Sequence, residues 1–208
     1  MRLYDAPFAP NPRRVRWVMA EKGIEDLDTV PIDPMRGEHK RPDYLDKAGL
    51  PLLPALELDD GTVIGESVAI ARYLESRWPE PNLFGRTPQE TAVIEMWLRR
   101  MELRLANPLM LWVRHTAPPL AVLEPQQDAA YAEHQRRVAM EGLELLDARL
   151  AGRDWIAADR ITIADIVTFV GIDFGRLIRF RPPESFAEVN RWAEAMRARP
   201  AAKAGVRG

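Results

Sequence analysis

The sequence predicts a protein of two parts, an α/β domain at the N-terminal end followed by an all-α domain. Three observations predict this division. Strand-like and helix-like stretches alternate up to about residue 78. A segment rich in proline and glycine follows and suits neither helix nor strand. Beyond it, apolar residues recur only at helical spacing. We therefore place the first domain at residues 1–78, the linker at 79–86 and the helical domain at 87–208.

Composition limits the possible functions. The chain has 208 residues, a net charge of −2 and no cysteine. This charge balance argues against a nucleic-acid partner, and the lack of cysteine excludes disulfides, thiolate metal sites and a cysteine nucleophile. No apolar run approaches the length of a membrane span, and the chain does not open on a signal-like core. We expect a cytoplasmic protein that binds no metal, nucleic acid or membrane.

The first domain opens with a strand at residues 1–5 and a loop. A helix is expected to start at Asn11, because asparagine favours the N-cap and Pro12 suits the first helical position. Gly23 should end this helix in a left-handed conformation. A strand at 27–32 and a polar, turn-rich stretch with a short helical segment near 42–47 come next.

A hairpin and a helix then follow, and they carry the first functional signal. Strands at 55–58 and 62–64 flank the turn pair Asp-Gly, and a helix opens at Glu66-Ser67. A serine hydroxyl and free backbone N–H groups at a helix start suit a small anion. Glu66 suits a nearby ammonium group. Together they fit the zwitterionic head group of a free amino acid.

Pro54 lies directly before the first strand of this hairpin. A cis bond at this proline would turn the chain sharply. The main-chain N–H and C=O of Leu53 would then point outward and could pair with an extended ligand as another strand does.

The run Leu-Pro-Ala-Leu, followed by Asp-Gly and by Glu-Ser at a helix start, resembles the glutathione-binding half of the bacterial-type cytosolic glutathione transferases. The resemblance implies a thioredoxin-like first domain, a helical-bundle second domain, glutathione as co-substrate and a homodimer. It assigns the cysteinyl backbone of glutathione to Leu53 beside Pro54, and the γ-glutamyl end to Glu66 and Ser67. Ordinary helix capping is the alternative role of that last pair.

The resemblance also assigns the glycine carboxylate of glutathione to a loop residue, His39, with Lys40 as the second candidate. A solvated loop histidine is the alternative. The family often carries Gln or Lys two residues before the proline, where this chain has Leu52. We therefore expect a weaker hold on this end of glutathione.

The thiol of bound glutathione needs a group that activates it. A free thiol has a pKa of about 8.5, and a helix N-terminus or a hydrogen-bond donor lowers it. Many relatives place Ser or Cys before the first helix, but here Ala9 occupies that place. The side-chain amide of Asn11 is the favoured catalytic candidate, with a plain N-cap as its alternative. The hydroxyl of Tyr4 and the main-chain N–H groups of residues 11–13 are further candidates.

A hydrophobic second substrate is expected between Phe8 and the long helix of the second domain. The candidate lining residues are Phe8, Met101, Arg104, Met110, Trp112 and His115. Such residues at helical spacing are also typical of a core. The cluster of Arg13, Arg14 and Arg16 is interpreted as a solvated or salt-bridged helix face, with anion steering as the alternative.

Capping signals define the helical domain. Boxes of the form Ser/Thr-x-x-Glu/Asp start at residues 87, 162 and 185, and Asp128 should cap a helix that ends near residue 152. Pro108 should kink or break the first, long helix. The stretch Thr-Ile-Ala-Asp at 162–165 resembles a folding motif of the same family, with a structural role.

The resemblance therefore implies a detoxifying glutathione S-transferase, whose bound thiolate attacks a hydrophobic electrophile. Two alternatives remain open. One is glutathione-dependent reduction of disulfides or peroxides, which suits an asparagine that offers no nucleophile of its own. The other is a non-catalytic ligand-binding protein of the same fold.

Overall fold

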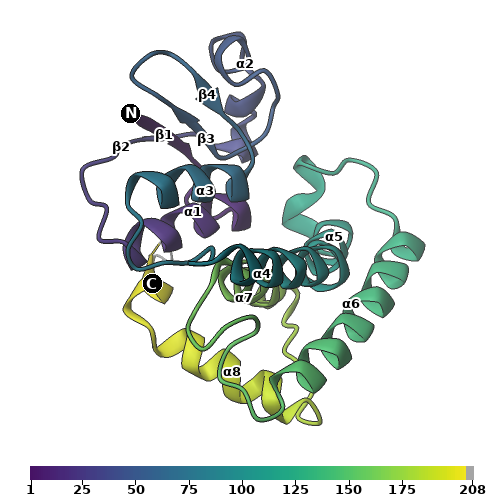
Figure 1. Cartoon of the computed structure of the whole chain (residues 1–208). Helices are drawn as coiled ribbons and strands as arrows, with labels where there is room; N and C mark the ends of the chain where they lie inside the picture. The colour runs from purple at the N-terminus through teal and green to yellow at the C-terminus, as the bar shows by residue number, and fades with distance from the viewer. Residues whose placement is uncertain (205–208) are drawn as a thin grey trace. The chain divides into compact units, whose positions relative to one another are not determined.

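The computed structural model describes residues 1–204, which group into two compact units (Figure 1). The first unit comprises residues 1–81 together with residues 200–204, and the second comprises residues 82–199. The expected fold class is confirmed, because the first unit is mixed α/β and the second is helical. Residues 200–204 belong to the first unit, although they follow the last helix of the second unit.

The first unit is built on a four-stranded mixed sheet with the strand order β2-β1-β3-β4. β1 pairs with β2 in parallel and with β3 in antiparallel, and β3 pairs with β4 in antiparallel. This arrangement matches the expected β-α-β and β-β-α order of a thioredoxin-like domain. The strands are β1 (Arg2–Asp5), β2 (Asp28–Pro31), β3 (Ala55–Glu57) and β4 (Val63–Ile64).

Helices cover both faces of this sheet. α1 (Pro10–Glu21) and α3 (Ser67–Arg77) lie side by side on one face, and α2 (Pro42–Ala48) lies on the other (Figure 1). Because side chains alternate along a strand, the paired Leu3 and Leu56 are buried on the opposite face from Tyr4 and Ala55, which pack against Tyr44 of α2. The 3₁₀ turns of this unit are η1 (Pro34–Arg36), η2 (Glu38–Lys40) and η6 (Pro200–Lys203).

The start of α1 differs from expectation. The helix begins at Pro10 and its N-cap is Ala9, so Asn11 lies inside the first turn and is not the cap. Pro10 suits this position because proline fixes a helical φ and the first helical N–H has no partner in any case. At the other end Gly23 has φ +63°, and it terminates the helix as predicted.

The second unit contains five α-helices in its described residues, 82–199. Two of the expected caps are confirmed: Thr87 accepts from the N–H of Glu90, and Asp128 accepts from the first N–H groups of its helix. The capping box of Thr162 and Asp165 is also present. The helices are α4 (Pro88–Met101), α5 (Asn107–Thr116), α6 (Ala129–Leu150), α7 (Ile163–Phe174) and α8 (Ala187–Ala198), and the 3₁₀ turns are η4 (Pro118–Val122) and η5 (Gly175–Ile178).

The third expected capping box, at Ser185, is wrong. The N-cap of α8 is Phe186, and no side chain of its own segment caps the helix. Instead, a carboxylate oxygen of Asp147 on α6 accepts from the N–H groups of Glu188 and Val189, both at 3.0 Å. A carboxylate at a helix N-terminus satisfies the same orphan donors and complements the helix dipole.

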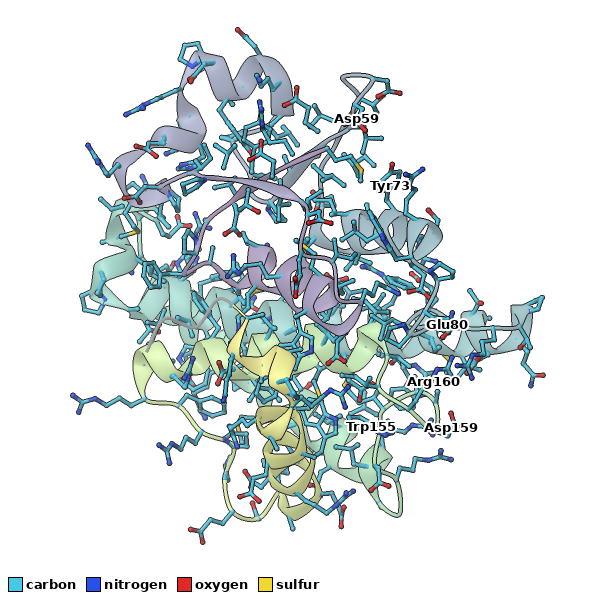
Figure 2. The ribbon with its side chains drawn as sticks, turned by 90° about the vertical axis from the view of Figure 1, so that its left-hand side faces the viewer. Asp59, Tyr73, Glu80, Trp155, Asp159 and Arg160 are labelled. Atoms are coloured by element: carbon cyan, nitrogen blue, oxygen red, sulfur yellow. The ribbon has the colours of Figure 1, made fainter. Side chains whose placement is uncertain are left out.

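Arg160 links the beginning of the second unit, at Asn82, to α4. Its guanidinium donates to the main-chain oxygen of Asn82 at 3.1 Å and to the Asn82 side-chain oxygen at 2.6 Å. It also pairs with Glu90 of α4, and Asp159 lies beside it (Figure 2).

A π turn, η3 (Glu102–Ala106), joins α4 to α5, where we expected Pro108 to kink or break the helix. The buried residues Met101, Leu105, Leu109 and Val113 recur every four positions. In an α-helix each such step overshoots the buried face by about 40°. A π turn holds more residues per turn and takes up this excess. The irregularity therefore keeps the apolar series facing the core.

Two glycines allow neighbouring helices to approach this π turn. A Cβ on Gly142 of α6 would lie 2.3 Å from the carbonyl oxygen of Arg104, and one on Gly171 of α7 would lie 2.6 Å from the Cα of Ala106. The N–H that would normally bond that Arg104 carbonyl is missing, because residue 108 is proline. The backbone of α6 thus packs directly on the altered turn.

We predict that Gly142→Ala and Gly171→Ala each destabilise the protein by about 1–3 kcal/mol, because the added methyl group overpacks against backbone. Without this contact, Gly→Ala inside a helix would stabilise the protein by about 1 kcal/mol. Urea unfolding measures the sign. Glu141→Ala, an exposed neighbour on the same helix, is the control and should change stability little. Increased stability of either glycine variant would contradict the packing.

Candidate functional site

The first turn of α1 offers few main-chain donors. Pro10 and Pro12 have no N–H, the N–H of Ala9 bonds the Ala6 carbonyl at 3.0 Å, and the N–H of Arg13 bonds the Ala9 carbonyl at 3.3 Å. Within residues 1–204, the N–H of Asn11 has no backbone partner outside the helix. The expected group of three donors at residues 11–13 is thereby reduced to one.

The side chain of Asn11 is also uncommitted. Its Oδ1 is buried and has no hydrogen-bond partner among the described residues. It does not cap α1, since Ala9 holds that position. The amide carries two N–H donors and one acceptor oxygen. Asn11 therefore brings a main-chain donor and a side-chain donor to the same end of one helix.

The start of α3 carries an unusual backbone. Glu66 is its N-cap and has φ +60° and ψ +119°, a region that non-glycine residues rarely occupy. Outliers of this kind cluster at ligand sites. No side chain caps α3. Ser67, the first helical residue, is 5% exposed, and its Oγ accepts a hydrogen bond from Arg14 at 3.4 Å.

The arginines of α1 do not form a solvated face. Arg13 and Arg14 are buried, and Arg13 donates to the main-chain oxygen of Ala202 at 3.2 Å. Arg16 forms a largely buried ion pair with Asp5, which confirms the salt-bridged interpretation for this residue. Burial raises the pKa of the Asp5 carboxyl, and the Arg16 charge opposes that rise.

Arg16 also shapes the loop before α1. It donates to the carbonyls of Ala6, at 3.4 Å, and Pro7, at 2.8 Å. These bonds fix the chain that leads into the first turn. Phe8 follows directly and is 80% exposed, so the loop presents a large apolar side chain to its surroundings.

The bond between Leu53 and Pro54 is cis, the isomer for which we expected the main chain of Leu53 to face outward. No hydrogen bond of the described residues outside the helices and strands uses the main chain of Leu53. The hydroxyl of Tyr44 on α2 donates to the carbonyl of Leu52 and so holds the residue before it. Burial raises the pKa of Tyr44 to about 12, which keeps this donor protonated. We did not identify Tyr44 from the sequence.

His39 lies in the turn η2 and is 7% exposed, so it is not the solvated loop residue that was its alternative reading. Lys40 beside it is exposed. This turn packs against α2. The pair therefore presents one buried ring and one solvent-facing cation.

Tyr4 faces the α2 side of the sheet and belongs to a polar cluster there. Its hydroxyl donates to a carboxylate oxygen of Glu57 at 2.5 Å and accepts from the ammonium of Lys47 at 3.0 Å. The hydrogen bond from Tyr4 lowers the pKa of the Glu57 carboxyl. The proton that a catalytic tyrosine would offer to a thiolate is thus bound to a carboxylate.

The residues expected to line a hydrophobic site have different surroundings in the second unit. Met101 is fully buried and belongs to the core. Arg104 is exposed on the π turn, and Met110 is half-buried. Trp112 packs edge-on against Phe180, with ring centroids 5.0 Å apart. The Nδ1 of His115 accepts from the N–H of Asp128 at 3.2 Å.

Two kinds of feature are absent from residues 1–204. No group of three or more His, Cys, Asp or Glu is placed to hold a metal ion. No helix in this range has the length and apolar character needed to cross a membrane.

Comparison with known proteins assigns the family. Residues 8–77 match the model of the glutathione S-transferase N-terminal domain, and residues 109–200 match the model of its C-terminal domain. The chain is 36% identical over 205 residues to glutathione S-transferase 2 of Saccharomyces cerevisiae, an alignment that covers 98% of this chain and 88% of the yeast protein. The chain belongs to the glutathione S-transferase family.

Solved structures agree with this assignment. The crystal structure of Gtt2 from Saccharomyces cerevisiae has a TM-score of 0.92 and covers 99% of this chain and 100% of its own. A glutathione S-transferase domain-containing protein of Marinobacter aquaeolei is 36% identical, with a TM-score of 0.91 and coverage of 97% and 99%. A glutathione S-transferase of Methylobacillus flagellatus, 25% identical with a TM-score of 0.83 and coverage of 100% and 99%, was solved with glutathione bound. Members of this family are transferases that use glutathione as a substrate.

We predict that Tyr4→Phe leaves the thiol pKa of bound glutathione unchanged and lowers stability. Because Glu57 has a lowered pKa in the folded protein, its stabilising contribution is present above its unfolded pKa and is lost as pH falls through the folded pKa. The stability gap between Tyr4→Phe and the natural protein should therefore shrink in acid. Thermal unfolding across pH measures it.

Tyr73→Phe is the matched control, since Tyr73 on α3 (Figure 2) donates to the sulfur of Met1 at 3.6 Å and not to a carboxylate among residues 1–204. It should show no gap that depends on pH. A raised thiol pKa in Tyr4→Phe would instead assign the catalytic hydroxyl to Tyr4.

Proposed function

We propose that this transferase lowers the pKa of the glutathione thiol through Asn11, and that the resulting thiolate attacks a hydrophobic electrophile. The observation that carries the proposal is the uncommitted amide of Asn11, whose buried Oδ1 has no partner among residues 1–204. A thiolate accepts hydrogen bonds, so it would take one from the Nδ2–H₂ of the amide and not from Oδ1. No bond to Oδ1 within residues 1–204 fixes the amide in another role, so its N–H₂ is available to the sulfur.

The surroundings of Asn11 support the same assignment. A thiolate near the start of α1 meets the positive end of the helix dipole. Because prolines flank Asn11 on both sides, its own N–H is the donor that this turn has available. The loop hydroxyl found in many relatives is replaced by Ala9. One residue then supplies both donors to the sulfur.

The rest of glutathione is assigned along the first unit. Main-chain groups of Leu53, beside the cis Pro54, pair with the cysteinyl backbone. Glu66 binds the γ-glutamyl ammonium and Ser67 binds its carboxylate. The glycine carboxylate is left to His39, with the exposed Lys40 as the second candidate, and Leu52 adds no donor there.

In the proposed reaction the thiol loses its proton to solvent, and the sulfur forms a bond to an electrophilic carbon whose leaving group departs with the bonding electrons. The proposed contacts of the electrophile are Phe8, Arg104, Met110, Trp112 and His115. Reduction of disulfides or peroxides is the second candidate, because an amide stabilises a thiolate without competing as a nucleophile. A non-catalytic binder is the third. Turnover of a small aryl chloride against a small mixed disulfide separates the three.

The decisive measurement is the thiol pKa of bound glutathione, followed by ultraviolet difference absorbance across pH. We expect the value to lie below the free value of about 8.5. A hydrogen bond to a charged group contributes about 1.5–3 kcal/mol, so Asn11→Ala should raise the bound pKa by about 1–2 units. Asn11→Asp should raise it further, because a carboxylate repels the thiolate.

Asn190→Ala is the control, since Asn190 carries the same amide in the second unit and bonds the carbonyls of Pro183 and Phe186. It should leave the thiol pKa unchanged. A low thiol pKa that survives Asn11→Ala would contradict the role of Asn11. An unshifted thiol in the natural protein would support a binder instead.

We also propose a homodimer, as the resemblance implied, paired through α3 and α4. Exposed apolar residues on and just beyond α4, Met96 and Leu103, support an interface there. Light scattering on the purified protein should give the mass of two chains, and monodispersity at the mass of one would overturn this. We propose the cytoplasm as the location, because its reduced glutathione pool supplies the substrate.

A further inference from the structure

Two arginines of the second unit lie against one tryptophan ring. Trp97 of α4 is buried. The guanidinium carbon of Arg149, in the last turn of α6, lies 4.5 Å from the centroid of the Trp97 ring, and that of Arg100 on α4 lies 5.0 Å from it. A guanidinium over an aromatic face is attracted to the ring. The ring therefore gathers two permanent positive charges that repel each other.

The main chain holds Arg149 in place as well. Its Nε donates to the carbonyl of Ile156 at 2.7 Å, and the N–H of Ile156 donates to the buried carboxylate of Asp165 at 3.0 Å. The two Nη groups of Arg149 have no hydrogen-bond partner among residues 1–204, and they are not enclosed by the protein. Their N–H donors lie in one plane, in a geometry that matches an oxyanion. Arg149 thus presents fixed donors that a ligand can reach.

A third arginine lies near these donors. Arg153 is exposed in the loop after α6, and its main-chain N–H donates to the carbonyl of Leu150 at 2.9 Å. Burial lowers the pKa of the Arg149 guanidinium, and the charges of Arg153 and Arg100 lower it further, so Arg149 lies close enough to both for repulsion. Within residues 1–204, no ion pair joins any of these three arginines to a carboxylate.

Little in the surroundings offsets the charge of this cluster. Asp154, next to Arg153 in the chain, pairs with Arg191 at 3.0 Å. α6 ends here, and a helix C-terminus carries only about half of a negative elementary charge, whereas α4 continues through the π turn into α5. More than two of the three positive charges are therefore left. A phosphate group, with a charge of about −1.5 to −2 at neutral pH, matches this excess.

We propose that Arg149, Arg100 and Arg153 form a binding site for the phosphate group of a small molecule. Arg149 binds two phosphate oxygens through its Nη donors, because paired N–H groups of arginine favour this bidentate contact. The exposed Arg100 and Arg153 add attraction for the remaining charge. Trp97 keeps the guanidiniums in place. The site lies within the second unit and shares no residue with the glutathione site of the proposed function.

The test uses inorganic phosphate and phenyl phosphate as probes, with sodium chloride holding the ionic strength constant. Binding to the full-length natural protein is measured by calorimetry. Thermal unfolding gives a second readout, because a ligand of the folded state raises the melting temperature. We expect both probes to bind. Equal affinities assign the site to free phosphate, and tighter binding of phenyl phosphate assigns it to a phosphate ester.

Arg149→Gln should weaken phosphate binding by about 10–100-fold, the range for a hydrogen bond to a charged group. Arg100→Gln and Arg153→Gln should each weaken it by up to about fivefold, since water screens exposed charges. Circular dichroism checks that each variant is folded. Where Arg149→Gln does not fold, Arg149→Lys takes its place. It keeps the charge but not the paired donors, and it should still weaken phosphate binding by about tenfold.

Arg99→Gln is the matched control, because Arg99 is an exposed arginine beside Arg100 on α4 but pairs with Glu102. This variant removes the same charge and should leave phosphate binding unchanged.

Three results would overturn the site. They are no binding of phosphate above that of chloride, no loss of binding in the folded Arg149 variant, and an equal loss in Arg99→Gln. Variants that turn a dimer into a monomer, in a protein that does not bind phosphate, would assign the cluster to contact with a second copy of this chain instead. None of these measurements depends on glutathione, so a failure here leaves the proposed function intact.

Discussion

Three arginines of α1 and the lysine at its C-cap are buried or largely buried, and each one binds a different segment of the first unit. Arg16 holds the loop that enters the helix, Arg14 reaches the start of α3, and Arg13 binds the described end of the chain. Lys22, at the end of the helix, donates to the carbonyls of Trp78 and Pro81 at 2.8 Å each and pairs with Glu75. A buried charge is tolerated only where such partners exist. α1 is therefore fixed by polar bonds as well as by its apolar face.

This arrangement matters for the site, because the proposed donor to sulfur is carried by the same helix. A catalytic group works best on a rigid element whose neighbours hold it in place. The bonds of Arg16 fix the chain before Asn11, and Arg14 connects the next turn to Ser67. The two ends of the proposed glutathione site, the thiol and the γ-glutamyl group, are thereby tied to each other through one helix.

Features whose partners lie close together in the sequence were predicted, and features whose partners lie far apart were missed. The cap at Thr162 was predictable, because both partners lie within four residues. The cap of α8 was not, since its acceptor, Asp147, comes from another helix and Ser185 offered a plausible local substitute. Burial of Arg14 depends on how α1 meets α3, which the sequence alone does not specify. The π turn before Pro108 left a signal in the four-residue spacing of the buried positions, but the proline alone pointed to a kink or a break.

An amide at the start of α1 gives the proposed chemistry a distinct character. A tyrosine carries a proton that can itself be lost, whereas the asparagine amide does not ionise in water's normal range. In the proposed mechanism the amide and the helix dipole are fixed donors, so neither of them adds a titration of its own to that of the glutathione sulfur. The hydroxyl of Tyr4, the other candidate, is already bound to Glu57 on the far face of the sheet. In this proposal the non-ionising amide of Asn11, between two prolines, takes the place of the loop hydroxyl, because this chain has Ala9 at that position.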